Sequence, residues 1–247
     1  MERAQFGLIG YGRFGRLIAS HLARVGRTVV YDPALTPGGQ LEGGLFAATP
    51  AVACAARVVI YAVPIRALRA AIADSAPHLR PGTLVCDTAS VKLGPAEWMR
   101  TELPPGVEIL ATHPLFGPDS AGDGLAGHRI VLCPVRVRHP RAIRRFLTAL
   151  GLVVHETSAD AHDREIAQTQ ALTHWLGRGL ERLEAGPRTI DTLGYRKLLE
   201  ILRYVVRDTP ELFEDMHRFN PHAAAERTRL LGTLASLDAE LGRSEPG

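Results

Sequence analysis

The sequence contains few of the residues that mark several specialised classes of protein. Its 247 residues include three cysteines, which lie in or beside apolar runs and lack the spacing of a metal site. We interpret Cys54, Cys86 and Cys133 as buried thiols in a reducing compartment, and we expect no metal. No apolar run reaches the roughly 18 residues of a membrane span, and no signal peptide precedes the first apolar run. These absences predict a cytoplasmic protein with no membrane partner.

The sequence also lacks a strong excess of charge. Its 29 Lys and Arg and 26 Asp and Glu give a formal net charge of +3, and the basic residues are spread along the chain. Its densest basic stretch, residues 136–145, is interpreted as a solvated helix and loop face. Nucleic acid is therefore not an expected partner. The 46% of hydrophobic residues is enough for the core of one large domain or two ordinary ones.

The most informative stretch is a glycine-rich loop between a predicted strand and a predicted helix. Gly10 permits a tight turn, Gly12 lets the backbone approach a pyrophosphate, and Gly15 lets the helix pack on the strand. Arg13 and Phe14 lie between these glycines and are assigned to the same cofactor site. The free N–H groups of the helix N-terminus suit a phosphate anion.

An acidic residue follows this loop at the spacing typical of dinucleotide-binding domains. Asp32 ends the second apolar run and would accept hydrogen bonds from the hydroxyls of an adenosine ribose. It would repel a 2′-phosphate, and no arginine follows it in residues 33–35. The expected cofactor is therefore NAD in preference to NADP.

Short β-branched runs alternate with helical stretches over the first 155 residues. The predicted strands are 5–9, 28–32, 58–63, 83–87, 108–112, 130–133 and 152–155. The predicted helices are 14–25, 65–78, 94–101 and 140–150. Strands that are apolar throughout are typical of a parallel sheet covered by helices on both faces.

After Ser158, the expected N-cap of a long helix, the pattern is helical only. Helices are expected over 159–185 and 191–207, and two more open at Thr209-Pro210 and Asn220-Pro221. The fold class is therefore α/β, with a Rossmann-type, doubly wound, mainly parallel sheet followed by an all-helical domain. We place the domains at 1–156 and 157–247.

Residues suited to catalysis cluster where strands of the predicted sheet end. Ligands of open parallel sheets bind beyond the carboxyl ends of the strands. One strand end carries Val63 and Pro64, assigned to the cofactor site, and the next is followed by Ser90 and Lys92. The strand after that ends at His113, whose imidazole titrates near neutrality and suits a base that removes a hydroxyl proton during hydride transfer. The alternative for His113 is a structural role, in which its ring holds a loop.

Several motifs together resemble the prephenate/arogenate dehydrogenase family of tyrosine biosynthesis. They are the glycine loop, Asp87-Thr-Ala-Ser-Val-Lys92, Thr112-His-Pro-Leu-Phe-Gly-Pro-Asp-Ser120, Ala161-His-Asp163, Gln170-Ala-Leu-Thr-His174, Thr192-Leu-Gly-Tyr195 and Glu211-Leu-Phe-Glu-Asp-Met216. The pattern is most similar to plant-type arogenate dehydrogenases. The resemblance implies oxidative decarboxylation of arogenate to tyrosine or of prephenate to 4-hydroxyphenylpyruvate, with hydride passing from ring C4 to the nicotinamide.

The resemblance also implies roles for individual residues. His113 matches the histidine that binds the ring hydroxyl, and Ser90 matches the serine that hydrogen-bonds that histidine and the hydroxyl. His174 matches a histidine lining the substrate pocket, with Gln170 one turn before it. Gly117 belongs to the substrate-side motif that follows His113. Lys92 has two open roles: it holds a substrate carboxylate, or it holds its own loop.

One position departs from the pattern of many bacterial members. They carry a carboxylate-binding arginine six residues before the proline that opens the penultimate helix, and here that position is Tyr204. Arg203 and Arg207 flank it but point elsewhere on a helix, and Arg196 is another candidate. In the plant-type subgroup, an acidic residue in the stretch that contains Asp163 favours a substrate amine. This gives a slight preference for arogenate over prephenate.

Three alternatives remain open from the sequence. A related dehydrogenase of a specialised pathway would act on an amino-substituted prephenate with the same residues. A β-hydroxyacid dehydrogenase is disfavoured, because that class has a lysine on the first long helix where this chain has residues Gln168-Thr-Gln170. A non-catalytic NAD-sensing dimer would have no use for the Ser90–His113 pair.

The family resemblance further implies a homodimer formed through the helical domain. Leu198, Leu199, Leu202 and Val206 fit an interface, although the same spacing fits an intrachain core. Nothing in the sequence resembles an appended chorismate mutase or a regulatory domain, so built-in feedback control is not expected.

Overall fold

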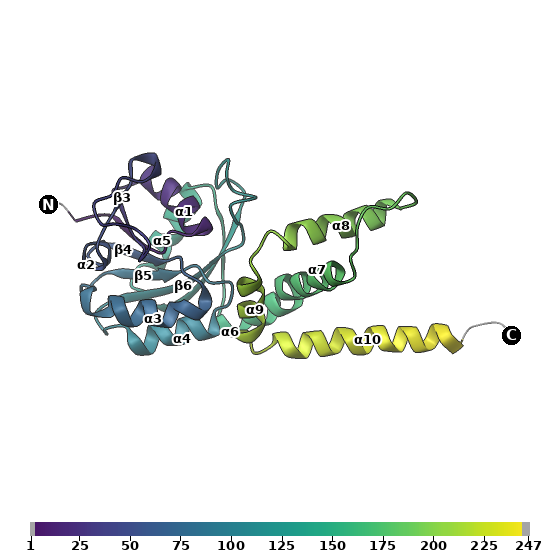
Figure 1. The fold of residues 1–247 in the computed structure, drawn as a ribbon. Coiled ribbons are helices and arrows are strands. Elements are labelled where there is room, and N and C mark those ends of the chain that lie inside the picture. Colours follow the sequence, from purple (N-terminus) through teal and green to yellow (C-terminus); the bar gives the residue numbers. More distant parts are fainter. Residues whose placement is uncertain (1–2, 244–247) are drawn as a thin grey trace. The chain divides into compact units, whose positions relative to one another are not determined.

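The computed structural model describes residues 3–243. The chain divides into two compact units between His162 and Asp163. The first unit is α/β and the second is helical (Figure 1). In the described part of the chain, no helix has both the length and the hydropathy that crossing a membrane would require.

One sheet forms the centre of the first unit. Its strands are β1 (Phe6–Ile9), β2 (Thr28–Tyr31), β3 (Phe46–Ala47), β4 (Val58–Tyr61), β5 (Leu84–Asp87), β6 (Glu108–Pro114), β7 (Arg129–Arg136) and β8 (Val153–Glu156). Their order in the sheet is β3-β2-β1-β4-β5-β6-β7-β8. Strands β1 to β6 are parallel, β7 is antiparallel to β6, and β8 is parallel to β7. This confirms the predicted Rossmann-type, mainly parallel sheet.

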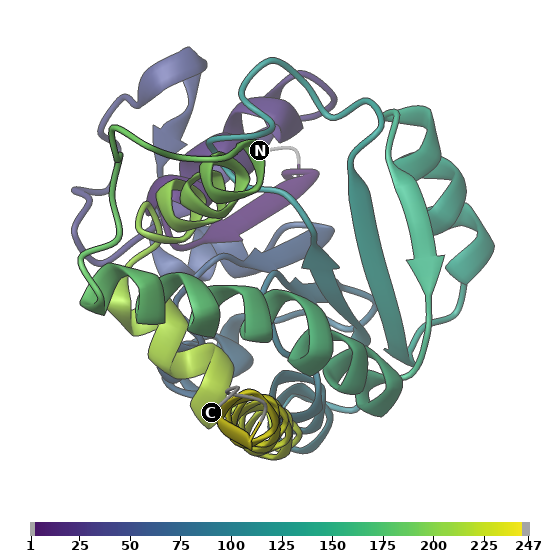
Figure 2. The ribbon, with the colours of Figure 1, turned by 90° about the vertical axis from the view of Figure 1, so that its right-hand side faces the viewer.

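Helices cover both faces of this sheet (Figure 2). They are α1 (Arg13–Ala23), α2 (Pro50–Cys54), α3 (Ile65–Ser75), α4 (Leu93–Glu102) and α5 (Pro140–Ala149). One core cluster packs β6 residues Ile109 and Ala111 with side chains from α2, α3 and α4. A second packs Leu110 with side chains from α1 and α5. This alternation follows from the two-residue period of a strand and explains why the strands are apolar throughout.

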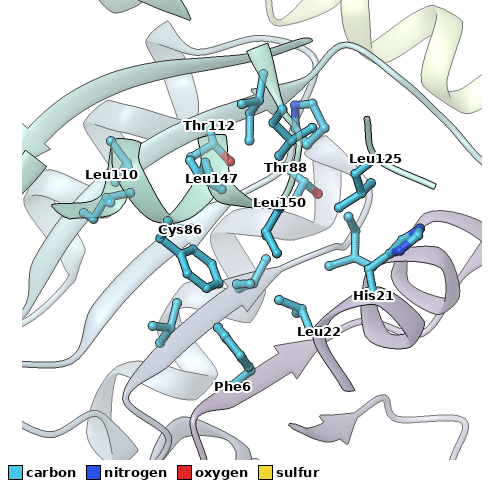
Figure 3. A pocket seen from close by; sticks show the side chains of 18 of the residues that line it. Phe6, His21, Leu22, Cys86, Thr88, Leu110, Thr112, Leu125, Leu147 and Leu150 are labelled. Atoms are coloured by element: carbon cyan, nitrogen blue, oxygen red, sulfur yellow. The ribbon is translucent and has the colours of Figure 1, made fainter. Parts of the chain in front are cut away.

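An apolar groove of about 340 Å³ lies on the α1 and α5 side of the sheet (Figure 3). It is lined by Phe6 and Leu22 near one end and by Thr88 and Thr112 at the strand ends. Cys86 also lines it, and burial raises the pKa of this thiol to about 12. All three cysteines are buried and free of disulfides, which confirms that part of the prediction.

The second unit consists of helices. Helix α6 (Ala159–Ile166) contains the boundary and continues through a π-helical turn (Ala167–Ala171) into α7 (Leu172–Arg182). The others are α8 (Leu193–Val205), α9 (Pro210–Arg218) and α10 (Ala223–Arg243). The Thr209 hydroxyl accepts the Leu212 N–H at 3.2 Å, and the Ser158 hydroxyl accepts the Ala161 N–H at 3.2 Å, so two of the three expected caps are confirmed. At the third, Asn220 accepts the His222 N–H at 3.0 Å, but α10 begins only at Ala223.

Helices α7 and α8 pack closely within this unit. A Cβ placed on Gly177 would lie 2.9 Å from two side-chain atoms of Val205, so the α7 backbone approaches α8 more closely than a larger residue would allow. The single helix expected over 159–185 is interrupted by the π turn. Such turns frequently occur at functional sites.

Candidate active site

The glycine loop has the geometry that a dinucleotide requires. Gly10 has φ +101°, and a Cβ there would lie 2.5 Å from the Ala62 carbonyl oxygen. A Cβ on Gly15 would lie 2.3 Å from the Gly10 oxygen, so Gly15 allows α1 to pack against the loop. Gly12 faces open space, because a Cβ there would meet no atom within 4 Å, and it begins α1 without a side-chain cap. The loop therefore presents backbone N–H groups at an open position that fits a pyrophosphate.

Asp32 is held against this loop. One carboxylate oxygen accepts the Tyr11 N–H at 2.7 Å, and the other accepts the Ala34 N–H at 2.9 Å. Arg13 pairs with Asp119 at 2.9 Å, but its side chain is 53% exposed. Exposed pairs of this kind contribute only about 0.2–1 kcal/mol, so the guanidinium can exchange Asp119 for a phosphate.

The remaining residues assigned to the cofactor differ in what they can offer. The Phe14 ring packs against the Phe116 ring at 6.1 Å, so Phe14 supports the core and offers only its backbone to a cofactor. Val63 contacts the Gly10 position, and Pro64 precedes the first turn of α3. The structure thus brings the loop, Asp32 and the Val63–Pro64 segment together at one edge of the sheet.

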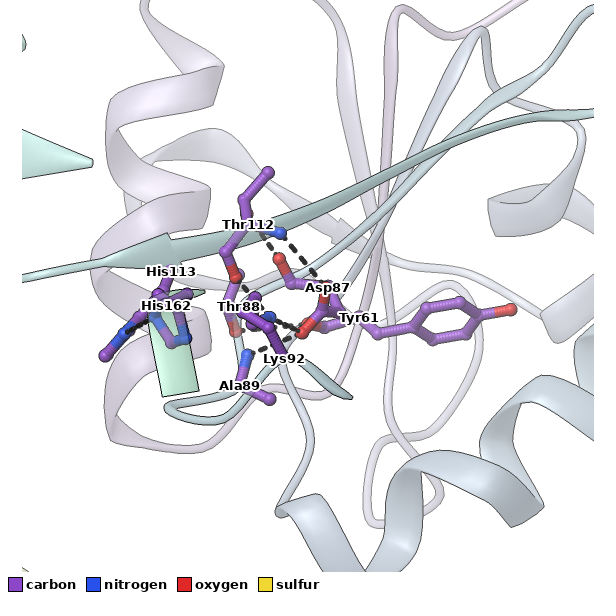
Figure 4. Close-up of polar contacts among 8 residues, drawn as sticks. All are labelled: Tyr61, Asp87, Thr88, Ala89, Lys92, Thr112, His113 and His162. Carbon is purple, nitrogen blue, oxygen red and sulfur yellow. Dashed lines mark hydrogen bonds and ion pairs between the residues drawn. The ribbon is translucent and has the colours of Figure 1, made fainter. Parts of the chain in front are cut away.

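A buried ion pair ties the ends of β5 and β6 together (Figure 4). Lys92 and Asp87 are completely buried and bonded to each other. Lys92 Nζ also donates to the Thr112 carbonyl at 2.6 Å, and the Thr112 N–H donates to Asp87 at 3.1 Å. Asp87 accepts the Ala89 N–H at 3.0 Å as well. These bonds show that Lys92 holds the loop, which is the second of its two open roles. Its role in binding a substrate carboxylate stays a prediction.

His113, the next residue after Thr112, is 2% exposed and lies against a second histidine. Its Nδ1 lies 2.9 Å from Nε2 of His162 on α6, and the two rings meet edge to face (Figure 4). Burial, with added effects of His162 and Lys92, holds the pKa of His113 well below its usual range. The ring is therefore neutral at neutral pH and able to accept a proton.

The contact with His162 was not expected from the sequence, and it occupies Nδ1 of His113. The expected hydrogen bonds of Ser90 to His113 and to the substrate hydroxyl stay predictions. Ser90 lies half-buried after β5. Gly117 donates its N–H to the Ser120 hydroxyl at 3.0 Å in the loop after β6. His162 was part of a recognised motif, but its spacing from His113 gave no signal that their side chains meet.

The other sequence-predicted substrate residues belong to the helical unit. His174 on α7 is 1% exposed, and burial, with a smaller effect of the Arg178 charge, lowers its pKa to about 4. Gln170 lies in the π turn. Asp163 is completely buried, and its carbonyl accepts the Asn220 side-chain amide at 2.8 Å. A contact between Asp163 and a substrate amine stays a prediction.

Two family models match the chain. One, described as the nucleotide-binding domain of prephenate dehydrogenase, matches residues 42–155. The other, described as a TYRAAT1-like C-terminal domain, matches residues 179–246. The two matches fall on the α/β part and the helical part of the chain.

Curated relatives match nearly the whole chain. Arogenate dehydrogenase 2 of Arabidopsis thaliana is 30% identical over 250 residues, which cover 96% of this chain and 70% of the relative. The 4-amino-4-deoxyprephenate dehydrogenase of Streptomyces pristinaespiralis is 30% identical, with 96% and 84% covered. Arogenate dehydrogenase 1 of Arabidopsis thaliana is also 30% identical, but the chain spans only 39% of its length.

A solved structure shows the same fold. Prephenate dehydrogenase from Aquifex aeolicus, in complex with hydroxyphenyl propionate and NAD+, superposes with a TM-score of 0.78. It is 18% identical in sequence, and the match covers 98% of this chain and 92% of that one. Taken with the relatives that match nearly the whole chain and the geometry of the glycine loop, this places the chain in the prephenate/arogenate dehydrogenase family.

Proposed function

We propose that this chain is an NAD-dependent dehydrogenase that oxidatively decarboxylates arogenate, or prephenate as a second substrate. The observation that carries the proposal is the buried, neutral His113 at the end of β6, with Nδ1 bonded to His162. Family membership supports the reaction, and the names of the Arabidopsis relatives support arogenate. Tyr204 at the position of the bacterial arginine supports the same choice.

The cofactor residues fit NAD. Gly12 leaves open space beside the first N–H groups of α1, and Asp32 holds an acceptor where an adenosine ribose is bound in this type of loop. When bound, the nicotinamide accepts a hydride from the substrate carbon that bears the hydroxyl. The Asp32 carboxylate would repel the 2′-phosphate of NADP.

His113 acts on the substrate hydroxyl. Among the described residues, no side chain bonds Nε2 of His113, so this nitrogen is the one that accepts the hydroxyl proton. For Nε2 to be an acceptor, the ring proton must reside on Nδ1 and be donated to an unprotonated Nε2 of His162. The 2.9 Å contact with His162 is compatible with this base tautomer. Such a base typically accelerates a reaction by about 10²- to 10⁴-fold.

The reaction balances without a further reactant. The C4–H bond breaks with its electron pair leaving as hydride, and the C4 oxygen takes on carbonyl character as its proton moves toward His113. The bond to the ring carboxylate then breaks, carbon dioxide leaves, and its electrons complete the aromatic ring. The proton returns to the phenol oxygen. Aromatisation of the ring makes the step thermodynamically favourable. The contribution of the chain is therefore to position the hydroxyl and to exclude water.

The test is a steady-state comparison of arogenate, prephenate and 4-amino-4-deoxyprephenate, each with NAD and with NADP. We expect the largest kcat/KM for arogenate with NAD. His113→Asn should lower kcat by about 10²- to 10⁴-fold while NAD binding, followed by protein fluorescence, is retained. Absence of turnover with all three substrates would reject the proposal and favour an NAD-binding module. The greatest kcat/KM with the amino-substituted substrate would assign the chain to the specialised pathway that its Streptomyces relative's name indicates.

We also propose that the chain forms a homodimer through its helical unit and works in the cytoplasm. Large apolar side chains of α10 are exposed along one stripe: Leu231, Leu234, Leu237 and Leu241. An exposed apolar stripe of this kind marks an interaction surface. A light-scattering mass equal to one chain would reject the dimer. The three buried free thiols support a reducing compartment, and fractionation of the source cells tests this.

A further inference from the structure

The buried polar atoms of the helical unit show an unusual lack of partners. Among the described residues, the buried side-chain atoms without a hydrogen bond are Gln170 Oε1, His174 Nδ1 and Nε2, Arg178 Nε and His217 Nε2. Buried polar atoms are normally bonded, and each exception costs about 1–3 kcal/mol. All five atoms belong to the second unit. Their concentration there indicates a site whose partner is a ligand.

The spacing of these residues brings three of them to one helix face. Gln170, His174 and Arg178 follow each other at intervals of four, which places them in a row along the π turn and α7. Phe213 on α9 connects this row to the fourth residue. The Arg178 guanidinium lies over the Phe213 ring at 6.0 Å, and the same ring meets His217 edge to face at 4.7 Å.

Three residues of this cluster, His174, Arg178 and His217, can donate hydrogen bonds or carry positive charge, whereas the unbonded atom of Gln170 is an acceptor oxygen. Burial lowers the pKa of both His174 and His217 to about 4, so each ring is neutral and offers one N–H. The charges of Arg178, next to His174, and Arg227, next to His217, add to these shifts. Arg227 lies 2.9 Å from His217 Nδ1.

The acidic groups nearby leave part of this donor set available. Glu181 accepts from Nη1 of Arg178 at 2.9 Å and is itself half-exposed, while the Asp208 carbonyl accepts from Nη2 at 2.6 Å. The Asp208 carboxylate lies 3.7 Å from His174 Nε2, beyond hydrogen-bond length. The Arg178 Nε–H and the two imidazoles therefore remain for an anion of low charge.

The position of the arginine found in many bacterial family members lies beside this cluster. That position is Tyr204 here, and its ring meets His174 edge to face at 6.2 Å. Tyr204 supplies no positive charge, whereas Arg178 supplies one from the helix turn after His174. A guanidinium on α7 can thus supply positive charge beside His174, where an arginine at position 204 of α8 would also supply it.

We propose that Arg178, with His174 and His217, binds a carboxylate of the substrate and replaces the arginine missing at position 204. This inference rests on the proposed function, since it assumes a substrate that carries carboxylates. Both the side-chain carboxylate and the ring carboxylate have the required chemistry. The test below separates these two sources.

The test uses the full-length protein with saturating NAD and two probes. One is 3-(4-hydroxyphenyl)propionate, which has a side-chain carboxylate, and the other is 4-ethylphenol, which has none. Binding is measured by calorimetry for wild type, Arg178→Gln, Arg178→Lys and His217→Phe. The matched control is Arg182→Gln, which removes an exposed arginine one turn further along the same helix.

A side-chain carboxylate site predicts a specific loss. Arg178→Gln should weaken the propionate about 10- to 100-fold, as expected for a charge-assisted hydrogen bond, and leave 4-ethylphenol and NAD binding unchanged. Arg178→Lys should restore part of the affinity, and Arg182→Gln should match wild type. If the propionate is unaffected but KM for prephenate rises to the same extent, the site holds the ring carboxylate.

Other outcomes would overturn the inference. Equal affinities and equal KM values in Arg178→Gln and Arg182→Gln would reject the carboxylate site even if the wild type is an active dehydrogenase. Equal weakening of both probes would give Arg178 a purely structural role, and His217→Phe then provides the second test of the site. A wild type that turns over no substrate, yet loses propionate affinity in Arg178→Gln, would reject the proposed function and keep the site.

Discussion

Replacing Lys92 by methionine removes the positive charge of a pair that is completely buried on both sides. The aliphatic part of the lysine side chain is approximately retained, so the substitution changes charge and hydrogen bonding more than packing. Asp87 would then be left as a buried carboxylate that retains the Thr112 and Ala89 N–H donors but has lost its ammonium partner.

The expected cost follows from that burial. Breaking a buried ion pair by removing one partner costs about 3–5 kcal/mol, because the remaining charge is uncompensated. The substitution also removes the 2.6 Å hydrogen bond from Lys92 to the Thr112 carbonyl, and this loss is part of the same cost. A domain of this kind is stable by about 5–15 kcal/mol in total, so Lys92→Met should remove a large part of that stability.

Urea unfolding, followed by circular dichroism and by intrinsic fluorescence, measures this loss. Lys197→Met is the matched control, because Lys197 is exposed on α8 and its substitution should change stability by less than about 0.5 kcal/mol. The double variant Asp87→Leu with Lys92→Met should recover only part of the loss. It removes the uncompensated charge, but the Thr112 and Ala89 backbone groups lose their partners. If Lys92→Met is as stable as wild type and raises only the KM of the substrate, the loop-holding role is wrong and Lys92 binds a substrate carboxylate.

Three further changes test other parts of the structure. His162→Gln should lower kcat and shift the acid limb of the pH–kcat profile to higher pH, because His162 helps to keep the pKa of His113 low. An acid limb at the wild-type pH would contradict the pairing of the two histidines. Asp32→Asn should weaken NAD and improve the kcat/KM ratio of NADP to NAD, and an unchanged ratio would remove Asp32 from the ribose site. Stability should fall as pH is lowered from about 6.5 to about 4, since His174 has a folded pKa of about 4 and the unfolded chain binds its proton first. His174→Phe should flatten this dependence in acid unfolding, and an unaltered slope would show that His174 does not cause it.

Much of the first unit could be predicted because its signals are local. The glycine loop is recognisable because the tight turn, the approach of a pyrophosphate and the packing of α1 need glycine at positions 10, 12 and 15. The apolar runs reflect burial on both faces of the sheet. The strand β3 and helix α2, with two and five residues, were not predicted because they are too short for any periodicity to register. The cap at Thr209 was predicted because a hydroxyl before proline has a specific use at a helix start.

The contacts that set the chemistry are not local and could not be predicted in the same way. His113 and His162 are 49 residues apart, so their pairing depends on how the chain after β8 returns to the end of β6. Lys92 lies five residues after Asp87, but nothing in that spacing shows that both side chains are buried. Arg178 has the sequence position of an ordinary helical surface arginine. Its partial burial, its bond to the Asp208 carbonyl and its unbonded Nε, which distinguish it from the exposed Arg182, are visible only in the structure.

The buried pair is better explained by positioning than by stability. Both backbone groups of Thr112 are bonded into it, the N–H to Asp87 and the carbonyl to Lys92, so the strand is fixed one residue before His113. With the backbone fixed there, the contact to His162 at 2.9 Å holds the orientation of the His113 ring. A hydride transfer coupled to proton removal tolerates little misplacement, and about 1 Å of error can cost 10²-fold in rate. An apolar pair of equal volume would avoid burying charge, but it would leave both buried Thr112 backbone groups without the partners that hold the base in place.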